Sequence, residues 1–204
     1  MAIYTLQHRP IGRTKRVPGT NRLEKCRPGL AAAYARYIFR SSACSTIIAR
    51  LPDGVPATVQ GVSRWLAACE RTDRANARIC DRIMVAIPCE LPPCLRTELI
   101  QTFAERLSQG RLPYAAAIHD LAGDDDNPHC HMILRDRDLE TGRRVLRTSD
   151  AGSTEYIREV WETVANEALA NAGYYERIDR RTLFEQGLDR RPGFHRGPDR
   201  RAVA

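Results

Sequence analysis

Asp126-Asn127-Pro128-His129-Cys130-His131-Met132-Ile133-Leu134 is the stretch that decides the fold of this chain. Side chains alternate between the two faces of a β-strand, so His129 and His131 point to one face and the apolar residues beside them to the other. The segment Tyr114–His119 has the pattern of a second strand. If the two strands pair as a hairpin, His119 joins the other two imidazoles.

Three neutral imidazoles on rigid strands can hold a metal ion and leave coordination positions open. The chain has 5 histidines, and His119, His129 and His131 fall within one short stretch with the required alternation. Ordinary half-buried histidines are the alternative. A zinc finger is disfavoured because Cys130 faces the other way and no Cys-x-x-Cys pair accompanies it. The pattern therefore predicts a three-histidine metal site.

The length of 204 residues suits one domain with its own apolar core. No run of about 18 apolar residues occurs, and the first residues lack the apolar core of a signal peptide. We therefore expect a cytoplasmic protein without a membrane segment. The 7 cysteines have irregular spacings, which is typical of reduced thiols rather than of a disulfide framework.

The net charge of +7 favours a polyanionic partner. Between Arg9 and Arg40 the chain has nine basic residues and one acid, Glu24. We expect a basic loop at residues 9–28 and a basic tail at residues 190–204. Most of the basic residues are arginines, which suit two-pronged contacts with phosphate.

Apolar periodicity predicts several helices and strands. Strands and helices do not alternate strictly, so the predicted class is α+β, with a central, largely antiparallel sheet and helices packed on it. Residues 41–56 have no clear pattern, and residues 135–153 are expected to form a strand edge and a turn. The predicted strands are 2–8, 82–88, 114–119, 129–134 and 174–178, and the predicted helices are 30–40, 62–78, 95–107, 153–172 and 182–186.

A metal beside a basic surface suggests polarisation of a phosphate oxygen. A tyrosine can attack phosphorus directly when the phosphate charge is neutralised. Tyr34 and Tyr37 lie three residues apart in the predicted helix, hence on neighbouring parts of one face. A nearby cation or metal would favour the phenolate of either tyrosine.

The sequence resembles the MobA/MobL relaxases of mobilisable plasmids, which belong to the HUH endonucleases. The resemblance covers nearly the whole chain, and its most specific part is Asn-Pro-His-Cys-His following Ala-Ile-His. The matching segments are Met1-Ala2-Ile3-Tyr4, Arg9 with Arg13, Tyr37-Ile38 with Arg40, Ala75-Asn76 with Arg78, Leu112-Pro113-Tyr114, Ala117-Ile118-His119, Asn127-Pro128-His129-Cys130-His131, Ile178-Asp179 with Arg181-Thr182-Leu183, and Pro192-Gly193 with His195 and Gly197-Pro198.

The resemblance implies an HUH relaxase fold and a single relaxase domain over residues 1–204 of a cytoplasmic, bacterial protein. The implied activity is the nicking of single-stranded DNA at a plasmid origin of transfer by tyrosine attack. A 5′-phosphotyrosine adduct would form, and reversal would rejoin the strand to end conjugative mobilisation. Accessory mobilisation proteins and a type IV secretion coupling protein are the implied protein partners.

The resemblance also assigns roles to individual residues. Tyr37 matches the nucleophile, with Tyr34 as the alternative, and the three histidines match the metal ligands. The family usually uses Mg²⁺ or Mn²⁺, and imidazole ligands favour manganese of the two. The DNA-contact candidates are Arg13, Lys15, Arg16, Arg40 and Arg78.

One position departs from the family pattern. Close relatives often carry glutamates in the strand before the proline, where this chain has Arg82 and Met84. Asp81 could substitute only after a one-residue shift, because such a shift turns the side chain to the other face. Two other functions remain open: a rolling-circle replication initiator that uses Tyr34 and Tyr37 as a pair, and a catalytically decayed protein that binds and represses its own origin.

Overall fold

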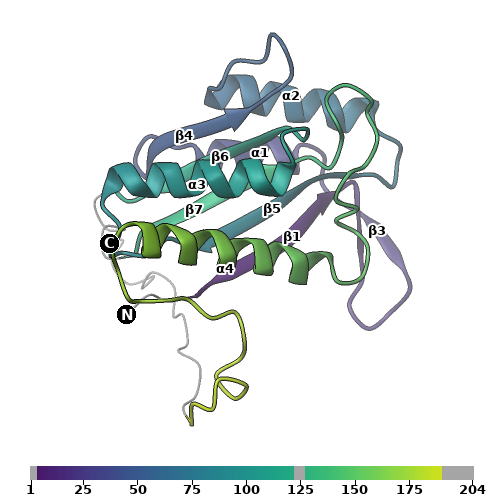
Figure 1. Cartoon of the computed structure of the whole chain (residues 1–204). Helices are drawn as coiled ribbons and strands as arrows, with labels where there is room; N and C mark the ends of the chain where they lie inside the picture. Colours follow the sequence, from purple (N-terminus) through teal and green to yellow (C-terminus); the bar gives the residue numbers. More distant parts are fainter. Residues whose placement is uncertain (1–3, 122–126, 190–204) are drawn as a thin grey trace, which may run out of the picture.

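A five-stranded antiparallel sheet with four helices forms the part of the chain that the computed structural model describes, residues 4–121 and 127–189 (Figure 1). The strand order is β1-β5-β7-β6-β4. This arrangement confirms the predicted α+β class. The sheet strands are β1 (Leu6–Gly12), β4 (Cys44–Arg50), β5 (Arg78–Ala86), β6 (Tyr114–His119) and β7 (His129–Leu134), and the helices are α1 (Leu30–Ile38), α2 (Val59–Thr72), α3 (Pro93–Ser108) and α4 (Ser153–Asn171).

The β6–β7 hairpin lies inside the sheet and has the predicted bounds. His119 is paired with His129, and Ala117 with His131, so all three imidazoles belong to one face of neighbouring strands. Cys130 belongs to the apolar core on the opposite face. The predicted alternation along this stretch is therefore confirmed.

Each face of the sheet is covered by one pair of helices. Helices α3 and α4 cover the face that receives Cys130, and Phe103 of α3 packs edge-to-face on Trp161 of α4 with ring centroids 5.0 Å apart. Helices α1 and α2 cover the other face, where Ile38 and Leu66 are fully buried. The histidines therefore lie on the same face as α1.

The N-terminal segment differs from the prediction. Residues 1–3 of the expected strand lie outside the described part, and β1 continues to Gly12. Strand β1 lies at the edge of the sheet, where alternate N–H groups point away from the neighbouring strand. Such a strand can include Pro10, because proline lacks only an N–H of this kind. The rest of the expected basic loop contains a separate antiparallel hairpin, β2 (Thr14–Arg16) and β3 (Leu23–Lys25). Our prediction of a loop over residues 9–28 was therefore wrong for these strands.

The helix predicted at residues 62–78 is also shifted. Helix α2 begins after Thr58, whose side chain accepts a hydrogen bond from the Gly61 N–H, and it ends at Thr72. A two-pronged ion pair between Asp73 and Arg135 (2.8 Å) then holds the chain out of the helix. Ile79 lies in β5, which starts at Arg78 rather than at residue 82.

The connection at residues 135–153 contains no strand. Its backbone is organised instead by the carboxylate of Asp136, which accepts the N–H groups of Val145, Leu146 and Thr148. Because one carboxylate accepts several backbone N–H groups, these groups need no neighbouring strand as a hydrogen-bond partner. The predicted strand edge is therefore wrong.

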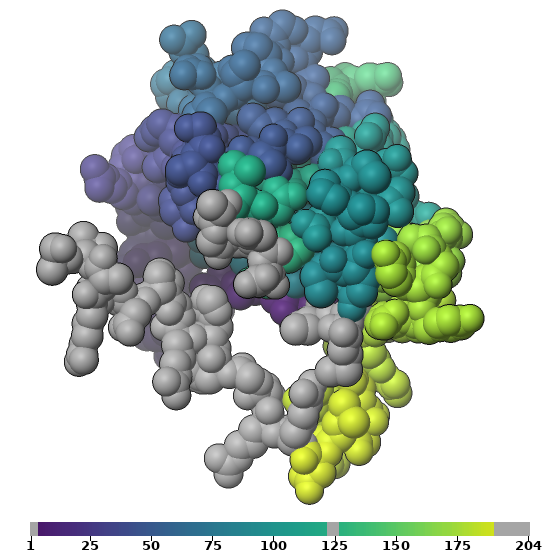
Figure 2. All heavy atoms as spheres, turned by 90° about the vertical axis from the view of Figure 1, so that its left-hand side faces the viewer, coloured from purple at the N-terminus to yellow at the C-terminus, as the bar shows by residue number. Residues whose placement is uncertain are grey.

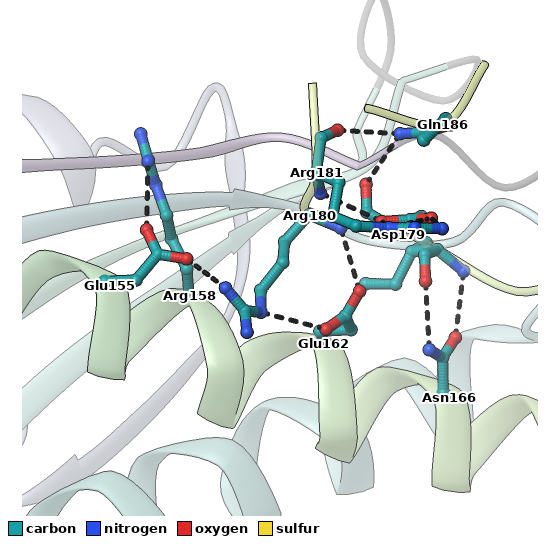
Figure 3. A network of polar contacts seen from close by, with 9 residues as sticks. Glu155, Arg158, Glu162, Asn166, Asp179, Arg180, Arg181 and Gln186 are labelled. Carbon is teal, nitrogen blue, oxygen red and sulfur yellow. Dashed lines mark hydrogen bonds and ion pairs between the residues drawn. The ribbon is translucent and has the colours of Figure 1, made fainter. Parts of the chain in front are cut away.

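The segment after α4 forms neither the strand predicted at 174–178 nor the helix predicted at 182–186. Side chains of α4 take over its backbone hydrogen bonds, as Figure 3 shows. Asn166 both donates to and accepts from the backbone of Ile178, and Glu162 accepts the Arg180 N–H. These polar contacts fix the segment along α4. The predicted basic tail at 190–204 lies outside the described residues.

No helix among the described residues is long and apolar enough to cross a membrane.

Candidate functional site: a three-histidine cluster beside two tyrosines

His119, His129 and His131 meet at one end of the sheet. Their ring centroids are 4.8 to 5.1 Å apart, and their possible ligand atoms all lie within 4.8 Å of one another. Two nitrogen atoms that bind the same cation can be about 4.2 Å apart at most, since a metal–nitrogen bond measures about 2.1 Å. A small inward movement would therefore let all three ligate one ion, and the donor set fits a metal site.

Backbone carbonyl oxygens orient the rings of His129 and His119. Nδ1 of His129 lies 2.9 Å from the carbonyl oxygen of Asn127, so it donates and leaves Nε2 as the ligand atom. Nε2 of His119 lies 2.6 Å from the carbonyl oxygen of Ile38, which ties the end of α1 to the cluster. Such partners fix the orientation of metal-binding imidazoles.

His131 is held in the neutral form. Burial and the neighbouring His119 and His129 lower the pKa of His131 to about 3. An imidazole must be neutral to bind a metal ion. At neutral pH, this ring is therefore ready to act as a ligand.

Helix α1 brings both tyrosines to the histidines, but in different environments. The hydroxyl of Tyr34 lies 3.1 Å from Nδ1 of His131, and burial, partly opposed by the charge of Arg82, raises the pKa of Tyr34 to about 12. Tyr37 is 56% exposed, and the guanidinium of Arg40 lies 4.4 Å from its ring centroid. Tyr34 is thus anchored to the cluster, whereas Tyr37 is open to a ligand.

A groove leads along α1 to the tyrosines. It has a volume of about 1020 Å³ and runs from the β2–β3 hairpin past Arg78 to Tyr34 and Tyr37. A smaller cavity of about 230 Å³ lies between the two tyrosines, His131 and Arg82. Neither hollow has a carboxylate among the described residues that line it. Both therefore suit an anionic ligand.

The histidine end of the sheet opens to the surface. Figure 2 looks onto this end, where the strands β6 and β7 reach the surface between the N-terminal third of the chain and α3. The β2–β3 hairpin extends from the opposite end of β1, because Gly12 pairs with Arg78 while Ala86, at the other end of β5, pairs with His129 (Figure 1). The groove thus begins at the hairpin end of the sheet and runs towards the histidine end as far as Tyr34, Tyr37 and Arg82.

The five predicted DNA-contact residues are not equally free to bind a ligand. Lys15 and Arg16 line the groove on the exposed hairpin, and Arg16 donates to the side chain of Asn21. Arg40 stacks on Tyr37 and donates to its carbonyl oxygen. The remaining two have other partners: Arg13 donates to the carbonyl oxygen of Asp73 and Arg78 pairs with Asp81.

Arg9 and Arg82 were not among the predicted contacts. Both line the small cavity together with His131. Arg82 is paired with Arg9 across β1 and β5, and its guanidinium lies 5.6 Å from the ring centroid of Tyr34. A charged residue in an otherwise apolar strand, as at Arg82, can indicate a binding role. Its pairing with Arg9, however, depends on the register of the two strands.

The structure also locates the residues that depart from the family pattern. Met84 is paired with His131, so it lies on the histidine side of the sheet with Arg82. Asp81 is buried and binds His8, Arg78 and Thr148. Asp81 therefore does not replace a carboxylate near the histidines.

Comparison with known proteins identifies related sequences. Mobilization protein A of Escherichia coli is 34% identical over 156 residues, which cover 66% of this chain and 22% of that protein. The 43 kDa relaxation protein of Salmonella typhimurium is 27% identical over 155 residues, covering 62% of this chain and 42% of that protein. The chain thus spans less than half the length of each of these two relatives.

Solved structures share the fold. A structure described as the molecular basis of vancomycin resistance transfer in Staphylococcus aureus superposes with a TM-score of 0.64 at 19% identity, over 89% of this chain and 100% of that one. The conjugative relaxase TrwC in complex with oriT DNA gives a TM-score of 0.56 at 12% identity, over 86% of this chain and 73% of that one. The sequence pattern of the MobA/MobL family matches residues 20–204. The chain therefore belongs to the MobA/MobL family.

Proposed function

We propose that this protein is a mobilisation relaxase, which nicks and rejoins one DNA strand at a plasmid origin of transfer through a tyrosine–DNA adduct. The observation that carries the proposal is the convergence of three histidines and two tyrosines at the end of a basic groove. Family membership and the DNA-bound relaxase TrwC, which shares the fold, support this function.

Tyr37 is the proposed nucleophile. Its oxygen attacks the phosphorus of one phosphodiester, a tyrosine–phosphorus bond forms, and the bond to the 3′ oxygen breaks. The phenol proton passes through solvent to the departing oxygen, which leaves as a 3′ hydroxyl. Reversal of the same exchange rejoins the strand, and no external energy source is required. The exposure of Tyr37 and the adjacent guanidinium of Arg40 suit this role.

Tyr34 has a different proposed role. With Nε2 of His131 as the ligand atom, Nδ1 would carry the proton and donate to the Tyr34 oxygen, which lies 3.1 Å away. Tyr34 is then a positioning residue that fixes the ring of a ligand. Its raised pKa disfavours the phenolate that attack requires.

His119, His129 and His131 are the proposed ligands of a divalent cation, Mn²⁺ or Mg²⁺. When bound, the cation supplies positive charge for the non-bridging oxygens of the attacked phosphate. Imidazole ligands favour manganese over magnesium. A TrwC structure with oriT DNA is metal-bound, which supports the proposal.

Cleavage of labelled single-stranded oligonucleotides that carry candidate origins tests the function. The unmodified protein should release a labelled fragment and form a covalent adduct with manganese, and neither product should form with chelator or with His129→Ala. Gln101→Ala is the control, because Gln101 is exposed on α3 and lies outside the cluster. Tight binding of the cognate origin without any adduct, whatever the metal, would establish the decayed repressor instead.

A replication initiator would give a different pattern. An enzyme that uses Tyr34 and Tyr37 as a pair would lose strand transfer when either tyrosine is replaced. A relaxase with one nucleophile would lose both cleavage and strand transfer only with Tyr37→Phe.

A further inference from the structure

Two arginines stand directly opposite each other on neighbouring strands. Arg9 of β1 is paired with Arg82 of β5, so their side chains leave the same face of the sheet. Like charges in directly opposed positions destabilise an antiparallel pair. Such a pair therefore requires an anionic neighbour or full exposure to water.

No acidic side chain meets this requirement within the described residues. Neither Arg9 nor Arg82 has an ion pair or a side-chain hydrogen bond there, whereas the neighbouring Arg78 is paired with Asp81 at 2.6 Å. The small cavity that both arginines line has no carboxylate in its described wall. Arg82 is only partly exposed, so water does not fully solvate its charge.

The same cavity contains the reacting groups. His131, Tyr34 and Tyr37 line it together with the two arginines. An anion that pairs with Arg9 and Arg82 would therefore lie next to the tyrosines and to the edge of the histidine cluster. Planar guanidinium groups suit the paired oxygens of a phosphodiester.

We infer that Arg9 and Arg82 form an anion clamp that binds the phosphodiester attacked by the tyrosine. This inference rests on the proposed function, and it names the residues that hold the reacting phosphate independently of the metal. The clamp neutralises the phosphate before attack and keeps the phosphorus beside Tyr37. Together with Lys15 and Arg16 on the β2–β3 hairpin, Arg82 forms a row of basic residues along the groove.

The clamp is tested by binding measurements in chelator, so that no metal contributes. Fluorescence anisotropy would follow a labelled single-stranded origin oligonucleotide and a second one whose attacked phosphate is a neutral methylphosphonate. Arg82→Gln should weaken binding of the normal strand about 10-fold, as expected for loss of one charge-assisted contact. The methylphosphonate should weaken binding to the unmodified protein similarly, but should add a clearly smaller loss in Arg82→Gln, where only Arg9 remains to pair with the phosphate.

The control is Arg64→Gln on the exposed face of α2, which removes the same charge outside both hollows. It should retain the full effect of the methylphosphonate. Arg82→Lys keeps the charge without the two-pronged geometry and should recover part of the affinity. If Arg82→Gln fails to fold, Arg9→Gln on the exposed edge strand makes the same test.

The outcomes separate the clamp from the activity. Independent, additive losses from Arg82→Gln and from the methylphosphonate would overturn the clamp, even if the unmodified protein forms a metal-dependent adduct. If no adduct forms with any metal yet the two losses are coupled, the proposed function fails, and Arg9 and Arg82 bind a phosphate that no tyrosine attacks. A methylphosphonate effect that couples to Arg64 instead would also overturn the clamp.

Discussion

Replacement of Asp81 by asparagine should destabilise the whole fold, because this carboxylate joins three parts of the chain. Asp81 is 1% exposed. His8 of β1 and Arg78 of β5 donate to one of its oxygens at 3.0 and 2.6 Å, and Thr148 of the 135–153 connection donates to the other at 2.7 Å. His8 in turn accepts from Thr154 at the start of α4, at 2.8 Å.

The size of the loss follows from these contacts. A hydrogen bond to a charged group contributes about 1.5 to 3 kcal/mol, and removing one member of a buried ion pair costs about 3 to 5 kcal/mol. Asparagine keeps the shape of aspartate, and the Arg78 side chain retains 23% exposure to water. We therefore expect Asp81→Asn to lower the free energy of unfolding by about 3 kcal/mol, towards the lower end of these ranges.

Urea unfolding followed by circular dichroism measures the effect. The midpoint should fall while the slope stays unchanged, because the surface exposed on unfolding is the same. The matched control is Asp53→Asn, which alters an exposed loop carboxylate. A loss below about 1 kcal/mol for Asp81→Asn, in the range of a surface change, would refute the reasoning.

Three further predictions concern the metal, the packing and the pH dependence. Manganese at about 100 times its dissociation constant should stabilise the protein by about 2.7 kcal/mol in thermal unfolding, and a shift that persists in His129→Ala would exclude the cluster as the site. Gly61→Ala should cost about 1 to 3 kcal/mol in urea, because the added Cβ would lie 2.2 Å from the carbonyl oxygen of Pro56; a loss near zero would mean that the turn at Pro56 moves aside. Burial opposes ionisation of Glu105, but the hydrogen bonds from Arg50 and Tyr114 outweigh it and hold the pKa of Glu105 below its usual value. The stabilisation from Glu105 should therefore be present above a pH of about 4.3 and be lost as the pH falls below it, so the difference in melting temperature from Glu105→Gln should shrink in acid rather than grow.

The histidine hairpin was predictable because its signals are local. Alternation over His129–Leu134, together with the spacing to His119, defines two strands and their pairing without any information from distant residues. The helix predicted at residues 95–107 likewise lies within α3, where Leu99, Phe103 and Leu107 are buried. The spacing of apolar residues within one helix or strand determines which of its faces is buried, and this does not depend on distant residues.

Other features depend on contacts between distant segments. The end of α2 is set by the pairing of Asp73 with Arg135, which are far apart in sequence. The Arg9–Arg82 pair exists only because β1 and β5 meet in one particular register. Neither propensity nor spacing carries this information, so the sequence predicted the histidine cluster and the tyrosine helix but not the arginines beside them.

The central claim is that Tyr37 becomes covalently bound to DNA. The most direct measurement is mass spectrometry of protease fragments from the adduct that forms with a cognate single-stranded origin and manganese, for the unmodified protein and for Tyr34→Phe. The account predicts a nucleotide phosphate on the fragment that contains Tyr37, and the same linkage in Tyr34→Phe. A phosphate on Tyr34, or an adduct that is lost in Tyr34→Phe and kept in Tyr37→Phe, would contradict it.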